Sequence, residues 1–172
     1  MPEDQKDFGN YFDDFVVGQV YKHALGRTIS EADNSWFTLL TMNTNPNHFD
    51  ANLASHTEFG QPLVNSGLTL AIVLGQSVHD ISQNAFANLG WKNIELKAPV
   101  FVGDTIYAES KITGLRESES RPYAGIVTVQ TRGYKQDGSV FITFERSVFV
   151  YKRDSTPIGD AFPDVTEPWP DA

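Results

Sequence analysis

The chain has 172 residues, contains no cysteine and carries a formal net charge of −9 at neutral pH. Its length suits one domain, and the lack of cysteine excludes disulfides, thiolate catalysis and cysteine-bound zinc. The acidic charge disfavours nucleic acid, whose phosphates are bound by Lys and Arg. No apolar run approaches the roughly 18 residues of a membrane helix, and residues 1–10 do not resemble a signal peptide. We therefore expect a cytoplasmic protein that binds neither nucleic acid nor a membrane.

By composition the chain divides into three parts. Residues 1–9 are mostly polar and acidic, and residues 154–172 contain four Pro and five acidic residues. Neither segment has a periodic apolar face, so neither predicts a packed helix or strand. We expect a flexible leader and an extended tail on either side of one domain, which spans residues 10–153.

The first elements predicted along the chain are a strand around residues 20–23 and a helix over residues 31–42. Ser30 is the natural N-cap of this helix, and Asp33 completes a weak capping box. The helix leads into a turn rich in Asn and Pro. A second short helix is predicted over residues 51–57 with Asp50 as its N-cap, and we prefer this interpretation of Asp50 to a catalytic one.

The second half of the chain predicts one long helix followed by strands. Residues 66–80 place apolar side chains almost all round a helix, which is typical of a buried one. Strands are predicted over residues 91–96, 105–115, 125–134 and 139–152, and Asp137-Gly138 marks a hairpin turn between the last two. The predicted fold class is therefore α+β: a hotdog fold, in which a curled antiparallel β-sheet wraps around one long buried helix. Because such a sheet has an open edge and one chain does not wall its cleft, we expect a homodimer or larger homo-oligomer.

Residues 43–50 (NTNPNHFD) are the most informative stretch of the chain. Pro46 fixes its own φ angle and restricts the residue before it, while Asn side chains favour turns by bonding to nearby backbone. This turn holds His48, and histidine is the residue type that exchanges protons most readily near neutral pH. His48 is thus a candidate acid/base group. A surface or capping histidine is the alternative that the spacing alone leaves open.

Residues 37–67 resemble the signature of MaoC-like dehydratases and R-specific enoyl-CoA hydratases. That signature runs Gly-Asp-x-Asn-Pro-x-His-x-Asp, then a small residue, then Phe-x-x-Pro-hydrophobic-Val-x-Gly. Here it matches MNTNPNHFD at residues 42–50, Ala54, and FGQPLVNSG at residues 59–67, and PVFVGDT at residues 99–105 resembles a later strand and turn. The resemblance covers residues 10–152. It implies an acyl-CoA thioester substrate and no cofactor, since CoA is part of the substrate.

The resemblance also assigns residues to roles, with two departures. His48 falls on the catalytic histidine, and either Ser66 or Gly67, next to Asn65, falls on the oxyanion-hole position at a helix start. The catalytic aspartate of the family, however, is replaced by Asn43, and the serine that steadies it by Leu74. An amide is no base, so Asn43 is expected to orient water or substrate instead.

Three functions are weighed on this basis. The leading one is a hydratase/dehydratase of 2-enoyl-CoA thioesters, in particular itaconyl-, mesaconyl- or methylmalyl-type ones that carry a carboxylate. Two like charges about 4 Å apart repel by some 4 kcal/mol at an effective dielectric near 20, so Asn43 would tolerate such a substrate where Asp would not. The alternatives are an acyl-CoA-binding pseudoenzyme, which Asn43 and Leu74 favour, and a hotdog thioesterase.

Three basic residues are candidates to bind a CoA phosphate or a substrate carboxylate, and each could equally be a solvated loop charge. They are Arg121, Arg116 and Lys97. No metal is expected, because His48 and His56 lack a third ligand at a suitable spacing.

Overall fold

The computed structural model of the chain describes residues 9–155 and 163–170. The expected leader, apart from Gly9, and residues 156–162 and 171–172 of the expected tail lie outside the described residues. The helices and strands are, in chain order, β1 (Val20–Lys22), β2 (Arg27–Thr28), α1 (Glu31–Leu40), α2 (Ala51–Ala54), α3 (Ser66–Gln76), β3 (Ala85–Leu96), β4 (Thr105–Glu117), β5 (Ala124–Lys135) and β6 (Val140–Tyr151). Short helical turns cover Phe12–Asp14, Pro46–His48, Val78–Ser82 and Arg153–Ser155.

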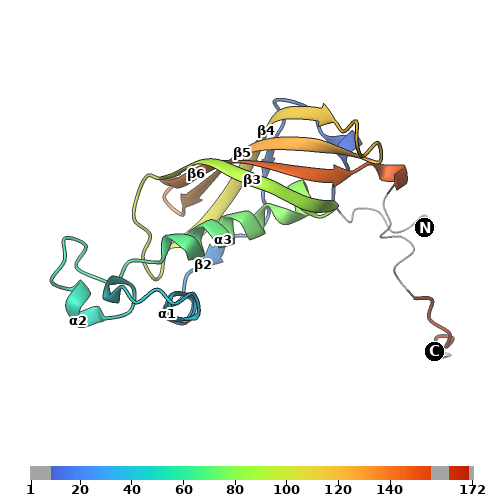
Figure 1. Cartoon of the computed structure of the whole chain (residues 1–172). Helices are drawn as coiled ribbons and strands as arrows, with labels where there is room; N and C mark the ends of the chain where they lie inside the picture. Colours follow the sequence, from blue (N-terminus) through green and yellow to red (C-terminus); the bar gives the residue numbers. More distant parts are fainter. Residues whose placement is uncertain (1–8, 156–162, 171–172) are drawn as a thin grey trace.

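The strands form one antiparallel six-stranded sheet in the order β1-β4-β5-β6-β3, with β2 paired to β4. Figure 1 shows α3 lying along one face of this sheet, with α1 and α2 beyond one end of it. Alternate residues of β4 point to the α3 side and are fully buried, as the period of a strand requires. The largest core cluster joins both layers: Ile29, Val64, Leu68, Val73, Val100, Ile106, Ala108, Phe141, Ile142 and Phe144. The predicted α+β class and antiparallel sheet are confirmed.

The long helix is shorter and less covered than its sequence predicts. It ends at Gln76, and a separate π-helical turn, Val78–Ser82, completes the predicted span. Only Leu68, Thr69 and Val73 of α3 are buried, whereas Ala71 is exposed. The prediction of a helix buried all round is wrong for one chain, because α3 meets the sheet along one face and none of residues 9–155 and 163–170 covers its opposite face.

The strand prediction is least accurate for β3. This strand begins at Ala85, where the sequence predicted a start at residue 91. Its pairing with β6 shifts register three times, including next to Gly90. Each shift breaks the alternation of apolar and polar residues that identifies a strand in a sequence. The first half of β3 was missed for this reason.

The hairpin predicted between β5 and β6 is confirmed. The N–H of Lys135 donates to the carbonyl of Ser139, and the N–H of Gly138 donates back to the carbonyl of Lys135, both at 2.9 Å. Gly138 has a φ angle of +83°, in the left-handed region that glycine adopts without a steric penalty.

Helix α1 begins with the predicted capping box. The hydroxyl of Ser30 accepts a bond from the N–H of Asp33, and the Asp33 carboxylate accepts from the N–H and hydroxyl of Ser30. These bonds from Ser30, together with Arg27, lower the pKa of Asp33 from its ordinary value of 3.8 to about 2. The helix ends at Leu40, two residues before the predicted end at Met42, because Met42 takes a left-handed φ of +59°.

We expect Ser30→Ala to lower the free energy of unfolding by about 1 kcal/mol, the usual effect of removing an N-cap hydroxyl. Because folding lowers the pKa of Asp33, its contribution is complete above 3.8 and is lost as the pH falls toward 2. Between pH 3.8 and pH 2 the free energy of unfolding should therefore fall less in Ser30→Ala than in the wild type. Urea unfolding of both proteins at pH 7 and pH 3 measures this, and equal curves would show that the box contributes nothing.

A buried polar network links the residue after β1 to β4, β5 and the turn that follows α3. His23, which is 5% exposed, bonds through Nδ1 to Asp80 Oδ2 (2.6 Å) and through Nε2 to the hydroxyl of Ser110 (2.9 Å). Ser110 in turn bonds to the hydroxyl of Thr131 (2.8 Å). These contacts tie β1 to the turn that follows α3, which agrees with a structural role for His23.

Candidate active site

The turn that carries His48 is built by its own amide side chains. The carbonyl oxygen of the Asn43 side chain accepts from the N–H of Asn45 (3.0 Å), and that of Asn45 accepts from the N–H of Asn47 (3.1 Å). Pro46 then opens a 3-10 turn that ends at His48. The predicted stiff turn is thus present, because each Asn bonds the backbone two residues on.

Helix α2 follows this turn directly. The carboxylate of Asp50 accepts from the N–H of Leu53 (2.9 Å), so the interpretation of Asp50 as an N-cap is confirmed. The helix ends at Ala54, where the sequence predicted residue 57.

The imidazole of His48 is held through one ring nitrogen. Its Nδ1 lies 3.0 Å from the backbone carbonyl oxygen of Leu63. A carbonyl oxygen only accepts, so we assign the ring hydrogen to Nδ1. In the neutral ring Nε2 then carries a free lone pair, which is the state that a general base requires.

Helix α3 begins at Ser66, where the sequence predicts it. Asn65 is the N-cap, and its side-chain oxygen accepts from the N–H of Gly67 (2.9 Å). A Cβ at Gly67 would lie 3.1 Å from Asn65 Oδ1 and 3.3 Å from Phe37 Cε1, which explains the small residue there. The N–H of Ser66 has no partner among the residues that the structure describes. Of the two proposed oxyanion donors, Ser66 therefore keeps a free N–H and Gly67 does not.

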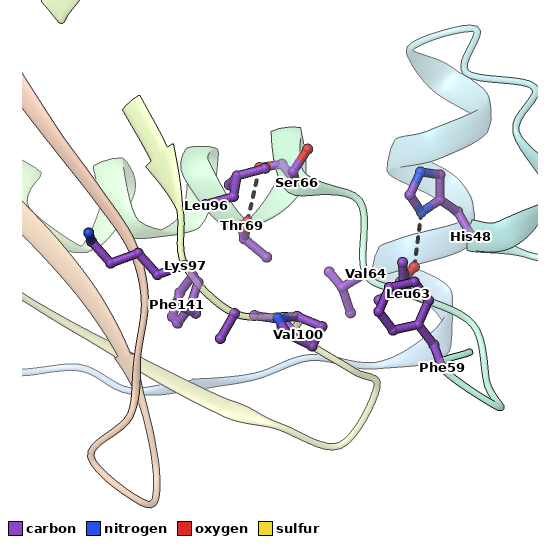
Figure 2. Close-up of a pocket in the computed structure, with 12 residues that line it drawn as sticks. His48, Phe59, Leu63, Val64, Ser66, Thr69, Leu96, Lys97, Val100 and Phe141 are labelled. Carbon is purple, nitrogen blue, oxygen red and sulfur yellow. Dashed lines mark hydrogen bonds between the residues drawn. The ribbon is translucent and has the colours of Figure 1, made fainter. Parts of the chain in front are cut away.

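His48 and Ser66 line one cavity of about 380 Å³. Figure 2 shows His48 at one side of this cavity, the start of α3 above it, and Lys97 and Phe141 at the other side. Its polar side chains are those of His48, Ser66, Thr69 and Lys97, and the rest of the lining is apolar: Phe59, Leu63, Val64, Leu96, Ala98, Pro99, Val100 and Phe141. The cavity thus brings a base candidate and a free backbone donor to one mostly apolar space.

Of these polar residues, Lys97 was predicted from the sequence as a site residue and Thr69 was not. Lys97 was predicted as an anion-binding candidate, and its Nζ lies 2.7 Å from Glu95 Oε2. Thr69 was missed. Its hydroxyl donates to the carbonyl of Ser66 (2.9 Å), and its position three residues after Ser66 on the same helix face was the signal that could have found it.

Five predicted site residues lie outside the cavity lining: Asn65 and Gly67 at the start of α3, and Asn43, Arg116 and Arg121. Asn43 uses its side-chain oxygen within the turn, and its amide N–H groups have no partner among the described residues. Arg116 and Arg121 lie near the opposite end of the sheet, where the Arg121 guanidinium sits 5.2 Å from the ring centre of Phe149. Phe149 is eight residues along β6 from Phe141, which is roughly 27 Å in a strand. One chain therefore does not bring these arginines to the cavity.

Two negative findings concern only the part of the chain that the structure describes. It holds no group of three or more His, Asp or Glu side chains that could bind a metal ion. None of its helices is both long enough and apolar enough to cross a membrane.

Comparison with known proteins identifies the family. A family model described as mesaconyl-CoA hydratase matches residues 2–164 of the chain. The chain belongs to the mesaconyl-CoA hydratase family. The resemblance to MaoC-like dehydratases and R-specific enoyl-CoA hydratases that residues 37–67 indicated is confirmed.

Individual relatives of this family member are of two lengths. The β-methylmalyl-CoA dehydratase of Chloroflexus aurantiacus is 40% identical over 152 residues, which are 85% of this chain and 41% of the relative. The (R)-specific enoyl-CoA hydratase of Aeromonas caviae is 33% identical over 132 residues, 77% of this chain and 92% of the relative. A Mycobacterium tuberculosis protein described as a double hotdog fold matches with a TM-score of 0.78 at 26% identity, over 92% of this chain and 48% of that one. The chain thus has the hotdog fold and spans less than half of the two longer relatives.

Proposed function

We propose that this chain adds water to, or removes it from, a 2-enoyl-CoA thioester whose acyl group carries a carboxylate, of the mesaconyl or β-methylmalyl type. The observation that carries the proposal is the shared cavity of His48 and the free N–H of Ser66. Relatives of both lengths are named as hydratases or dehydratases of CoA thioesters, which supports it.

The chemistry follows from the two groups on the cavity wall. Nε2 of His48 takes a proton from water while the water oxygen forms a bond to the β-carbon of the enoyl thioester. The electrons of the double bond move to the thioester oxygen, where the N–H of Ser66 and the positive end of α3 stabilise the charge. The thioester then re-forms as the imidazolium returns the proton to the α-carbon. Dehydration is the reverse sequence.

A carboxylate on the substrate accounts for Asn43. In a mesaconyl-type thioester the carboxylate is attached to the carbon that water attacks, so it lies close to the base. A second carboxylate at position 43 would repel it, by about 4 kcal/mol at about 4 Å and an effective dielectric near 20. Asn43 lies outside the cavity lining but in the turn that carries His48, and its amide N–H groups, which have no partner among the described residues, would donate to a carboxylate that extends beyond this lining.

The alternatives are a thioesterase and a pseudoenzyme. A thioesterase more often places a carboxylate on its central helix, whereas α3 carries no charged residue. A test follows the absorbance of the enoyl thioester with mesaconyl-, itaconyl- and crotonyl-CoA, with a thiol reagent in parallel. We expect loss of the double bond without free thiol. Thiol release would indicate the thioesterase, and binding without either change would indicate the pseudoenzyme.

Lys97 is the anion-binding candidate that lines the cavity, and we expect it to bind the substrate carboxylate. Lys97→Met should raise KM for mesaconyl-CoA about tenfold, since a hydrogen bond to a charged group is worth about 1.5–3 kcal/mol. KM for crotonyl-CoA, which has no carboxylate, should change little. Arg121→Met is the matched control. Equal changes of KM for the two thioesters would show that Lys97 does not recognise the carboxylate.

We also propose that the chain assembles with a second hotdog unit, as a homodimer or a larger homo-oligomer. Among the described residues the outer edge of β3 has no strand partner, and Leu89, Trp91 and Leu96 on this strand are exposed. The longer relatives have room for such a unit in one chain. Light scattering at micromolar concentration should give at least twice the chain mass of 19.1 kDa, and a single chain mass would contradict the proposal.

A further inference from the structure

One buried amide connects the three segments that make up the candidate active site. Asn34 lies on α1 and is 1% exposed. Its side-chain nitrogen donates to the carbonyl of His48 (2.7 Å) and to the carbonyl of Leu63 (2.9 Å). Its side-chain oxygen accepts from the N–H of Asn65 (2.8 Å), directly before α3.

Both amide hydrogens of Asn34 and its oxygen are therefore in use, and asparagine alone fits this set of partners. An aspartate at this position would lack both donors and bring a buried charge against two carbonyl oxygens. An apolar residue of similar volume would leave two carbonyls and one N–H buried without these bonds. A glutamine has the same amide group, but its extra methylene would move that group away from the three partners.

The bonds of Asn34 control how His48 is held. The carbonyl of Leu63 accepts from Asn34 and from Nδ1 of His48, so Asn34 fixes the oxygen that orients the ring. The bond to the carbonyl of His48 fixes the backbone of the same residue. Through Asn65 the same amide also fixes the start of α3, where the free N–H of Ser66 lies.

We propose that Asn34 is a positioning residue, which holds His48 in its Nδ1–H form and sets the ring against the start of α3. Asn34 is absent from the lining of the 380 Å³ cavity and lines, with His48, a separate cavity of about 190 Å³, so within the candidate site it acts through His48 and not on the substrate. Its effect on turnover rests on the proposed hydratase function, whereas its effect on the His48 ring does not.

The test uses Asn34→Ala and reads the ring directly. ¹⁵N NMR of the histidine side chains, with the His48 signals assigned by their loss in His48→Ala, should show Nδ1–H and unprotonated Nε2 in the wild type. In Asn34→Ala a substantial share should shift to the Nε2–H form that free histidine favours. An unchanged His48 spectrum would overturn the proposal whether or not the chain is a hydratase.

Kinetics separate positioning from loss of stability. Asn34→Ala should lower kcat on the best thioester at least tenfold and leave KM within about twofold. Ser110→Ala is the matched control, because it also removes buried hydrogen bonds but lies in the His23 network. It should lower the melting temperature and keep kcat. Equal losses of kcat in the two variants would overturn the proposal.

The role of Asn34 can still be decided if Asn34→Ala does not fold or if the wild type has no hydratase activity. Should Asn34→Ala not fold, Asn34→Ser, which keeps one short donor, takes its place in both measurements. A wild type with no activity on any thioester would contradict the proposed function alone, since the ¹⁵N spectra would still decide the role of Asn34.

Discussion

Replacing His48 with alanine is expected to lower hydratase turnover by about 10²–10⁴-fold, the usual contribution of a positioned acid/base group. The ring is the one imidazole on the wall of the described cavity, and its Nε2 is the atom that would activate water. The fold should survive, because the turn is held by Asn43, Asn45 and Pro46 and not by the ring. Single-turnover absorbance measurements on the best thioester give the rate, and circular dichroism gives the fold.

His56 provides the control for this experiment. Its Nδ1 also lies near a backbone carbonyl, that of Asn52 (2.8 Å), but the residue is exposed and lies outside the cavity lining. His56→Ala should keep wild-type turnover. If His48→Ala kept most of its turnover on the best substrate, the assignment of His48 as the base would be wrong.

Asn43→Asp is expected to move two substrates in opposite directions. With mesaconyl-CoA the added carboxylate repels the carboxylate of the substrate and removes an amide donor, so kcat/KM should fall by about tenfold or more. With crotonyl-CoA the variant restores the carboxylate that the wider family carries, so kcat/KM should rise. The rise will be limited because Leu74 stands where relatives have a serine that would orient the new group.

Asn43→Asp should leave the turn over residues 43–48 intact, so a change in rate reports on the added charge. An aspartate oxygen accepts from the N–H of Asn45 as the Asn43 oxygen does. If the wild type hydrates crotonyl-CoA well and Asn43→Asp changes neither rate, Asn43 takes no part in the chemistry.

Features set by neighbouring residues in the chain were predictable from sequence. The capping box of Ser30 and Asp33, the cap at Asp50 and the hairpin at Gly138 each involve residues at most four positions apart, and each is present. The same local chemistry identified the turn around His48. The resemblance then placed His48 and the start of α3 in one site, which the shared cavity agrees with.

Features that depend on distant segments were not predictable. The bonds of Asn34 span 14, 29 and 31 residues, and no local pattern signals them. The choice of Lys97 over Arg116 and Arg121 depends on which end of the sheet each occupies. The burial of α3 was overestimated, because apolar composition shows that a face needs cover but not which molecule supplies it.

The ratio of kcat/KM for mesaconyl-CoA to kcat/KM for crotonyl-CoA in the wild-type chain shows whether the site selects a substrate that carries a carboxylate. A substrate carboxylate that the ammonium of Lys97 binds, with no second carboxylate at position 43 to repel it, should favour mesaconyl-CoA by about tenfold or more, which corresponds to about 1.4 kcal/mol. Loss of turnover on both thioesters in His48→Ala would attribute the activity to the cavity that His48 lines. Hydration of crotonyl-CoA at an equal or higher kcat/KM, or no hydration of either thioester, would contradict the account.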